Sequence, residues 1–253
     1  MRRLLLAVPA VALLAACSSS GGGRAAIPSG MPTDVNGVSN LVQSAISKIT
    51  SAHLTLDITL VGQKLTGSGD ETSANGRLTA LDLTENLPNG GGAIRVITVG
   101  GKTYVKLPSS LNSSGKPYLL VSPSSSNQVV RQLAGSLDSA LSAASLDSVV
   151  IFTRAAKSIE AKGTETVNGT QTVHYSVVVD VSKLPGSLPG KSDLTQNGID
   201  TLPLELYVDT TGRPVQITEE FTTQGQKVST KSIVSDYNKP VTITAPPPNE
   251  VGS

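Results

Sequence analysis

Cys17 is the only cysteine of the chain, and its surroundings are the clearest sign of chemistry in the sequence. Arg2 and Arg3 precede an apolar run from Leu4 to Ala16, and a Ser/Gly tract follows the cysteine directly. At about 1.5 Å per helical residue the run spans roughly 20 Å, short of the ~30 Å hydrocarbon core of a bilayer. The pattern predicts a cleaved export signal rather than a membrane-spanning helix.

The residues Leu14-Ala15-Ala16-Cys17 resemble the bacterial lipobox, in which the signal is cut before the cysteine and the cysteine receives acyl chains such as palmitate. A lone exported thiol cannot form an internal disulfide, and lipidation accounts for its presence. Two or more acyl chains give stable anchoring, whereas a single chain binds marginally. We therefore predict that Cys17 tethers the protein to the outer face of the bacterial cytoplasmic membrane, in the cell envelope. The alternative is an ordinary secreted protein, cut near Ala16, with a free cysteine.

The other chemistry-bearing residues form no catalytic constellation in the sequence. His53 and His174 each lie among apolar residues of a strand-like stretch, and two histidines with one cysteine are too few for a usual zinc site. Glu219 and Glu220 are adjacent in a predicted strand, so they point to opposite faces and cannot act as a convergent pair. The fragment Gly101-Lys102-Thr103 lacks the first glycine of a phosphate-binding loop. We therefore predict no enzymatic activity, no metal and no cofactor.

Composition narrows the classes of partner. The formal net charge is +1, and loss of Arg2 and Arg3 with the signal changes it by two units to −1. No dense Lys/Arg stripe is present, so we predict no nucleic-acid binding. Aromatic residues make up 3% of the chain, so its core must be built from Leu, Val, Ile and Ala, and a base-stacking or sugar-stacking surface is disfavoured.

Hydrophobic periodicity predicts the elements that would position a site. Apolar residues at helical spacing indicate an amphipathic helix over 36–51. The period then becomes two, so that Leu54, Leu56, Ile58 and Leu60 share one face of a strand. Further strands are predicted over 64–74, 77–84, 93–99, 102–107, 117–121, 159–167, 173–181, 204–208, 215–221, 227–237 and 241–244.

Two helical segments interrupt the strands. A stripe at intervals of three or four residues predicts a helix that carries Val130, Leu133, Leu137 and Leu141. A second short helix is predicted from Asp147, with Val149 and Phe152 on its apolar side, and residues 185–197 are predicted as a loop.

The order helix, strands, helical insert, strands predicts an α+β, mostly β fold with about ten strands. Short turns favour one large antiparallel sheet, which at that width must curl, with helices on its concave face. The expected organisation is a signal peptide over 1–16, the lipidated cysteine and a flexible linker over 17–33, one domain over 34–248, and a disordered tail over 249–253.

Five stretches, taken together and in this order, resemble the LppX/LprA/LprF/LprG family of actinobacterial lipoproteins. They are "SAHLTLDITL", "GGKTYVKL", "AKSIEAKGTETVNGTQTVHYSVVVD", "LPLELYVDTTGRPVQITEEF" and "VSDYNKPVTITAPPP", which fall within residues 36–248. The resemblance implies a half-barrel, similar in shape to the LolA/LolB lipoprotein carriers, with an apolar cavity between the sheet and its helices. It also implies binding of acylated lipids or lipoglycans and their transfer between the membrane and outer envelope layers.

On this interpretation the ligand is an acylated lipid or glycolipid, a membrane lipid exporter is a candidate partner, and the protein is a monomer. The candidate cavity residues are the apolar ones of the strands and helices: Leu54, Leu56, Ile58, Leu60, Val96, Val130, Leu133, Leu137, Leu141 and Phe152. The pattern alone also allows these faces to pack together as a filled core. In that case the chain would be a tethered scaffolding or protein-binding lipoprotein without a lipid ligand.

Overall fold

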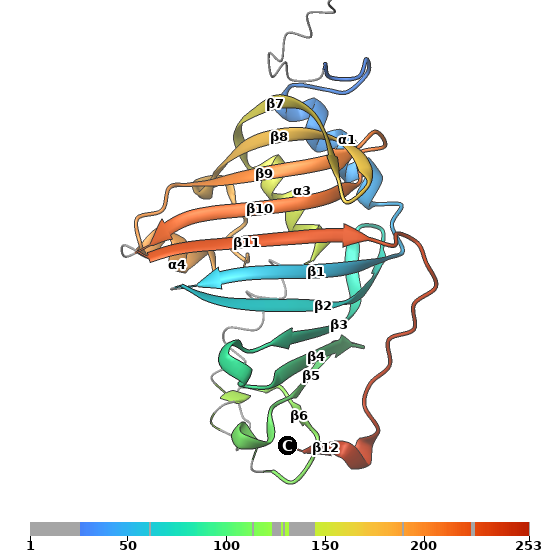
Figure 1. Cartoon of the computed structure of the whole chain (residues 1–253), viewed down its shortest axis with the longest axis vertical. Helices are drawn as coiled ribbons and strands as arrows, with labels where there is room; N and C mark the ends of the chain where they lie inside the picture. The colour runs from blue at the N-terminus through green and yellow to red at the C-terminus, as the bar shows by residue number, and fades with distance from the viewer. Residues whose placement is uncertain are drawn as a thin grey trace, which may run out of the picture.

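The structure of the chain is a computed structural model, which describes residues 26–60, 62–112, 114–122, 128, 130–131, 145–188, 190–223 and 226–252. One open sheet of twelve strands dominates it, with three α-helices, α1, α3 and α4, among the described residues (Figure 1). The helices are α1 (Val35–Ile46), α3 (Leu146–Arg154) and α4 (Lys191–Gln196). The strands of the first half are β1 (Ser51–Leu60), β2 (Gln63–Ala74), β3 (Arg77–Asn86), β4 (Ala93–Val99), β5 (Lys102–Lys106) and β6 (Tyr118–Leu120). Those of the second half are β7 (Ala156–Val167), β8 (Thr170–Asp180), β9 (Thr201–Asp209), β10 (Pro214–Thr223), β11 (Gln226–Ser235) and β12 (Val251–Gly252).

The strand order is β12-β6-β5-β4-β3-β2-β1-β11-β10-β9-β8-β7. Two antiparallel meanders, β1–β6 and β7–β11, are therefore joined where β1 pairs with β11. Asn75-Gly76 and Asn168-Gly169 adopt positive φ at both positions and close two of the hairpins, as their sequence predicts. The prediction of a single curved, mostly antiparallel sheet with helices on one face is confirmed.

We call the face of the sheet that carries Leu54 and Leu56 the inner face, because α1 and α3 lie over it (Figure 1). Asp34 caps α1 by accepting a hydrogen bond from the Gly37 amide at 2.9 Å. The buried side of α1, with Val38 and Val42, packs with the buried side of α3 in one continuous core. The helices thus cover the part of the sheet beside β7, β8 and β3.

Three parts of the predicted organisation are wrong in detail. Residues 26–33 are not all linker, because Ile27 and Met31 pack against the core and the Tyr175 hydroxyl donates to the Pro32 carbonyl at 2.8 Å. The predicted loop 185–197 contains α4. The predicted strand at 241–244 does not form, and this segment runs past the sheet without pairing (Figure 1).

The C-terminal residues are also more ordered than predicted. Instead of a disordered tail over 249–253, Val251–Gly252 form β12, which pairs in parallel with β6. The Lys116 ammonium donates to the Asn249 carbonyl at 2.8 Å and holds the approach to this strand. β12 therefore covers an edge of β6 that would otherwise present unpaired backbone groups.

Candidate functional site

The inner face of the sheet is closed where it lies under α1 and α3. Along β1 the inward residues Ala52, Leu54 and Leu56 are 0%, 1% and 2% exposed. Phe152 of α3 and Val96 of β4 belong to the same apolar cluster. These residues form one continuous buried hydrophobic cluster.

The same inward rows become accessible farther along the strands. The next inward residue of β1 is Ile58, which is only partly buried, although its neighbours Leu54 and Leu56 are fully covered. The other strands show similarly half-buried inward residues, namely Leu65, Ile94, Ile217 and Val228. We call these five residues the open apolar wall. Apolar side chains that face the helix-covered side of a sheet and still reach solvent are those that can contact an apolar ligand.

Two glycines on β2 lie on the inner face beside the closed core. Gly67 lies opposite Leu56, and Gly69 lies opposite Leu54, so both occupy inward positions that would otherwise hold side chains. A Cβ at Gly69 would lie 2.0 Å from the Asp82 carbonyl oxygen and 2.7 Å from the Leu83 Cα atom. β2 and β3 therefore approach each other at Gly69 more closely than a residue with a side chain would allow.

Three carboxyl groups also point to the inner face. Glu71 is fully buried on β2, and neither carboxyl oxygen has a hydrogen-bond partner among the described residues. Burial raises the pKa of Glu71 to about 8, against the opposing effect of the nearby Leu146 amide. Burial also raises the pKa of Glu219 on β10 to about 7, and it raises the pKa of Glu85 on β3. Burial thus favours the protonated form of these carboxyl groups, and a protonated carboxyl group can donate a hydrogen bond within an apolar wall.

These inward carboxyl groups were not among the sequence-predicted site residues. For two of them, the alternation of apolar residues in the sequence indicates that the side chain faces inward. Glu219 continues the apolar alternation of Val215 and Ile217, and Glu85 continues that of the inward leucines of β3. Glu71 follows Gly67 and Gly69 in its strand, so no apolar alternation marked its face.

The predicted cavity residues divide into three groups. Leu54, Leu56, Val96, Val130 and Phe152 lie together in the buried cluster, so they line its closed part. Ile58 lies in the open apolar wall, and Leu60 is placed only by its backbone pairing with Gln63 and Val228. Leu133, Leu137 and Leu141, like Cys17, lie outside the described residues. A ligand role for any of these residues stays a prediction.

The histidines lie on the outer face and contact carboxylates. His53 Nδ1 lies 2.7 Å from Asp70 Oδ1. His174 lies between Glu165, 2.9 Å from Nδ1, and Glu205, 2.6 Å from Nε2, and its ring stacks on Tyr207 with centroids 4.2 Å apart. These contacts join side chains of adjacent strands. They do not border the inner face.

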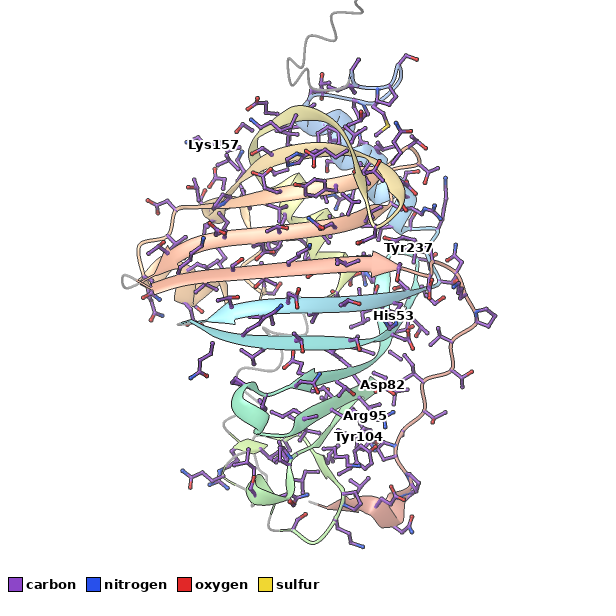
Figure 2. The ribbon with its side chains drawn as sticks, viewed as in Figure 1. His53, Asp82, Arg95, Tyr104, Lys157 and Tyr237 are labelled. Atoms are coloured by element: carbon purple, nitrogen blue, oxygen red, sulfur yellow. The ribbon has the colours of Figure 1, made fainter. Side chains whose placement is uncertain are left out.

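A second cluster of polar side chains joins neighbouring strands on the outer face near β3–β6. The Arg95 guanidinium donates to both oxygens of Asp82, at 2.7 and 2.5 Å, and to the Tyr118 hydroxyl at 3.1 Å. Figure 2 labels Arg95 and Asp82 on their neighbouring strands. The hydrogen bonds that Arg95 donates to Asp82 raise the pKa of Arg95 above its usual range. Glu220 also lies on the outer face and pairs with Lys227 at 2.7 Å, on the opposite side of β10 from Glu219, as predicted.

No cluster of three or more His, Cys, Asp or Glu side chains able to hold a metal ion occurs in the described ranges. None of the helices that the structure describes has the length and apolarity needed to cross a bilayer.

The chain is similar to known proteins in its three-dimensional structure. No protein-family model and no curated protein sequence matches it. The solved structure of lipoprotein LppX from Mycobacterium tuberculosis superposes with a TM-score of 0.53 at 15% identity, covering 83% of this chain and 98% of that one. LprF from Mycobacterium bovis gives a TM-score of 0.53 at 16% identity, covering 85% of this chain and 99% of that one. The chain thus has the LppX/LprF half-barrel fold, as the sequence resemblance implied.

Proposed function

We propose that this chain, which has the fold of LppX and LprF, is an envelope lipoprotein that binds acylated lipids against the inner face of its sheet and carries them between membrane and outer envelope layers. The observation that carries the proposal is the open apolar wall. Its five residues continue the rows of the buried core and remain accessible. The export signal and the lipobox at Cys17 supply the tether, and the fold shared with two mycobacterial lipoproteins agrees with it.

The energetics of such a carrier follow from apolar transfer. Each CH₂ group that leaves water gains about 0.8 kcal/mol, so a 16-carbon chain gains roughly 12 kcal/mol. A bilayer offers a similar gain, so movement between a membrane and an equally apolar wall is nearly isoenergetic. Aliphatic walls accept chains of different lengths, and the inward carboxyl groups of Glu85 and Glu219 supply the few polar contacts that orient a ligand.

A lipid carrier of this kind needs no catalytic group. In the described part of the chain the inner face presents carboxyl, hydroxyl and apolar groups, without a nucleophile beside a histidine base. The two histidines lie on the opposite face. We therefore propose binding and transfer rather than enzymatic turnover.

The test is to identify bound lipid. The full-length chain carrying Cys17→Ala is purified from the exported fraction, so that neither its own acyl chains nor bulk membrane contribute lipid. Extraction and mass spectrometry are expected to find a long-chain acylated lipid in near-stoichiometric amount. Absence of such a lipid, together with failure to load one in vitro, would contradict the proposal. It would favour the alternative, a tethered scaffolding protein whose interior is filled.

A further inference from the structure

A separate cleft of about 400 Å³ opens where α1, α3 and the β2–β3 turn meet, and its lining shares no residue with the open apolar wall. Gln43, Ile46 and Ser47 of α1 form one side, at intervals of three and four residues. Four residues on one side of α3 form the second: Asp147, Val150, Ile151 and Arg154. The turn residues Asn75, Gly76 and Arg77 close the third side.

The three sides are fixed relative to one another. The Asp147 carboxylate accepts a hydrogen bond from the Leu78 amide at 3.2 Å, which joins the start of α3 to β3. The Arg154 guanidinium donates to Gln43 Oε1 at 2.6 Å, which joins the end of α3 to α1. A Cβ on Gly76 would lie 3.5 Å from the Ser47 Cα atom, so the turn lies against the end of α1. The cleft is therefore built by contacts between ordered elements.

The rim of the cleft carries excess positive charge. Arg77 and Arg154 are both exposed, and Asp147 is the one acidic residue beside them. Within the described ranges the Arg77 guanidinium makes no hydrogen bond or salt bridge, although its charge acts on the Asp147 carboxyl group and partly offsets the burial that raises the pKa of Asp147. The Arg154 guanidinium has only the neutral amide of Gln43 as partner. Most of the donors of both guanidinium groups are thus free to bind an anion, which they can hold in bidentate fashion.

The backbone carbonyls at the end of α1 that border the cleft already accept hydrogen bonds. The carbonyls of the last turn of α1, at Gln43, Ser44, Ala45 and Ile46, accept hydrogen bonds from Ser47, Lys48 and Ile49. The end of this helix therefore offers the cleft few free carbonyl groups that would repel an anion.

The lining below the arginines is apolar. Ile46 belongs to the core, and Val150 and Ile151 are partly buried against it while they border the cleft. A free inorganic anion would gain nothing from this surface, whereas the first carbons of an amphiphile would be removed from water on it.

From the charged rim and apolar lining together, we infer that the cleft between α1, α3 and the β2–β3 turn binds the anionic head group of an amphiphile, with Arg77 and Arg154 as its phosphate or carboxylate ligands. This site does not depend on the open apolar wall and adds a second, charge-selective site to the proposed function.

The probe is decyl phosphate, compared with decyl glucoside and with inorganic phosphate. Binding to the full chain carrying Cys17→Ala is followed by NMR at the Arg77 and Arg154 side-chain Nε–H groups, which distinguishes this cleft from the interior. Decyl phosphate is expected to shift both signals. Arg77→Gln with Arg154→Gln should weaken its binding roughly tenfold, as loss of charge-assisted hydrogen bonds implies. Lys102→Gln, at an exposed lysine of β5, is the matched control and should change nothing.

Three results would overturn the inference. Inorganic phosphate that binds as tightly as decyl phosphate would show a site for free anions. If decyl glucoside shifts the same signals with equal affinity, the site does not select ligands by the charge of their head group. Unchanged binding of decyl phosphate to the double variant, with its fold verified by circular dichroism, would exclude the arginines. If decyl phosphate binds here and no lipid is found in the interior, this site stands and the carrier proposal fails.

Discussion

Glu71 on β2 lies directly opposite Ala52 on β1, so its carboxyl group is held on the inner face of the sheet, fully buried and without a hydrogen-bond partner among the described residues. Leu81 flanks it on the other side, on β3. An unpaired carboxyl group in such a place is stable mainly in its protonated form.

Glu71 therefore gives the protein a pH-dependent stability. Its pKa is about 8 in the folded chain against the usual 4.5, so the folded state binds more protons between these values. The free energy of unfolding should fall as pH rises from about 5 to 8, by on the order of 4 kcal/mol at the limit. Glu71→Gln should reduce this dependence in urea titrations across that pH range, and the part that remains comes from Glu219, whose pKa burial also raises, to about 7. The same slope in Glu71→Gln, with Glu220→Gln as exposed control, would contradict the assignment.

Ile58 tests whether the open apolar wall takes a ligand. Ile58→Trp places a larger side chain where an acyl chain would lie and is expected to lower the lipid recovered by mass spectrometry at least severalfold. Thr55→Trp, on the outer face of the same strand, is the control and should leave lipid content unchanged. Equal loss in both variants would point to a general folding defect instead.

Gly69 tests the close approach of β2 and β3. Gly69→Ala introduces a Cβ that meets the Asp82 carbonyl and the Leu83 backbone, neither of which can move aside as a side-chain end would. We expect a loss of about 2 kcal/mol or more in the free energy of unfolding. Gly186→Ala adds the same methyl group where nothing lies within 4 Å and should have little effect. Comparable midpoints for the two variants in denaturant titration would show that the strands are less tightly joined.

Arg95 and Asp82 are expected to contribute through their paired hydrogen bonds rather than by charge alone. Both side chains are partly exposed, at 41% and 26%, so solvent screens their attraction. A double-mutant cycle with Arg95→Lys and Asp82→Asn should give a coupling energy of about 1 kcal/mol, since lysine cannot replace the bidentate contact. A coupling energy near zero would mean that Tyr118 and the strand pairing hold Arg95 without help from Asp82.

Cys17 tests the tether. Cys17→Ala removes the acylation site and should move the protein from the membrane fraction to the soluble exported fraction, because no acyl chains remain to anchor it. Ser18→Ala, at the next residue, should stay with the membrane. Retention of Cys17→Ala on membranes, judged by fractionation and immunoblotting, would show that another part of the chain provides the attachment.

The sequence by itself predicted the elements whose patterns are local. Leu54 and Leu56 share an inward face because side chains alternate along a strand, and Asn75-Gly76 closes a hairpin because both residues tolerate positive φ. The helix over 36–51 and the curved antiparallel sheet followed from the same rules, although α1 itself begins at Val35 and ends at Ile46.

Only the tertiary structure decided what these elements enclose. Several contacts join residues that are distant in the sequence, so no local pattern marked them. They are the pairing of β1 with β11, the docking of Val251–Gly252 on β6, and the presence of Arg77 and Arg154 in one cleft. The same holds for Glu71, whose face is set by its neighbours β1 and β3. Periodicity tells which side of an element is apolar, but whether that side is filled or left open depends on the volume that distant elements bring to it, and this volume is a property of the assembled fold.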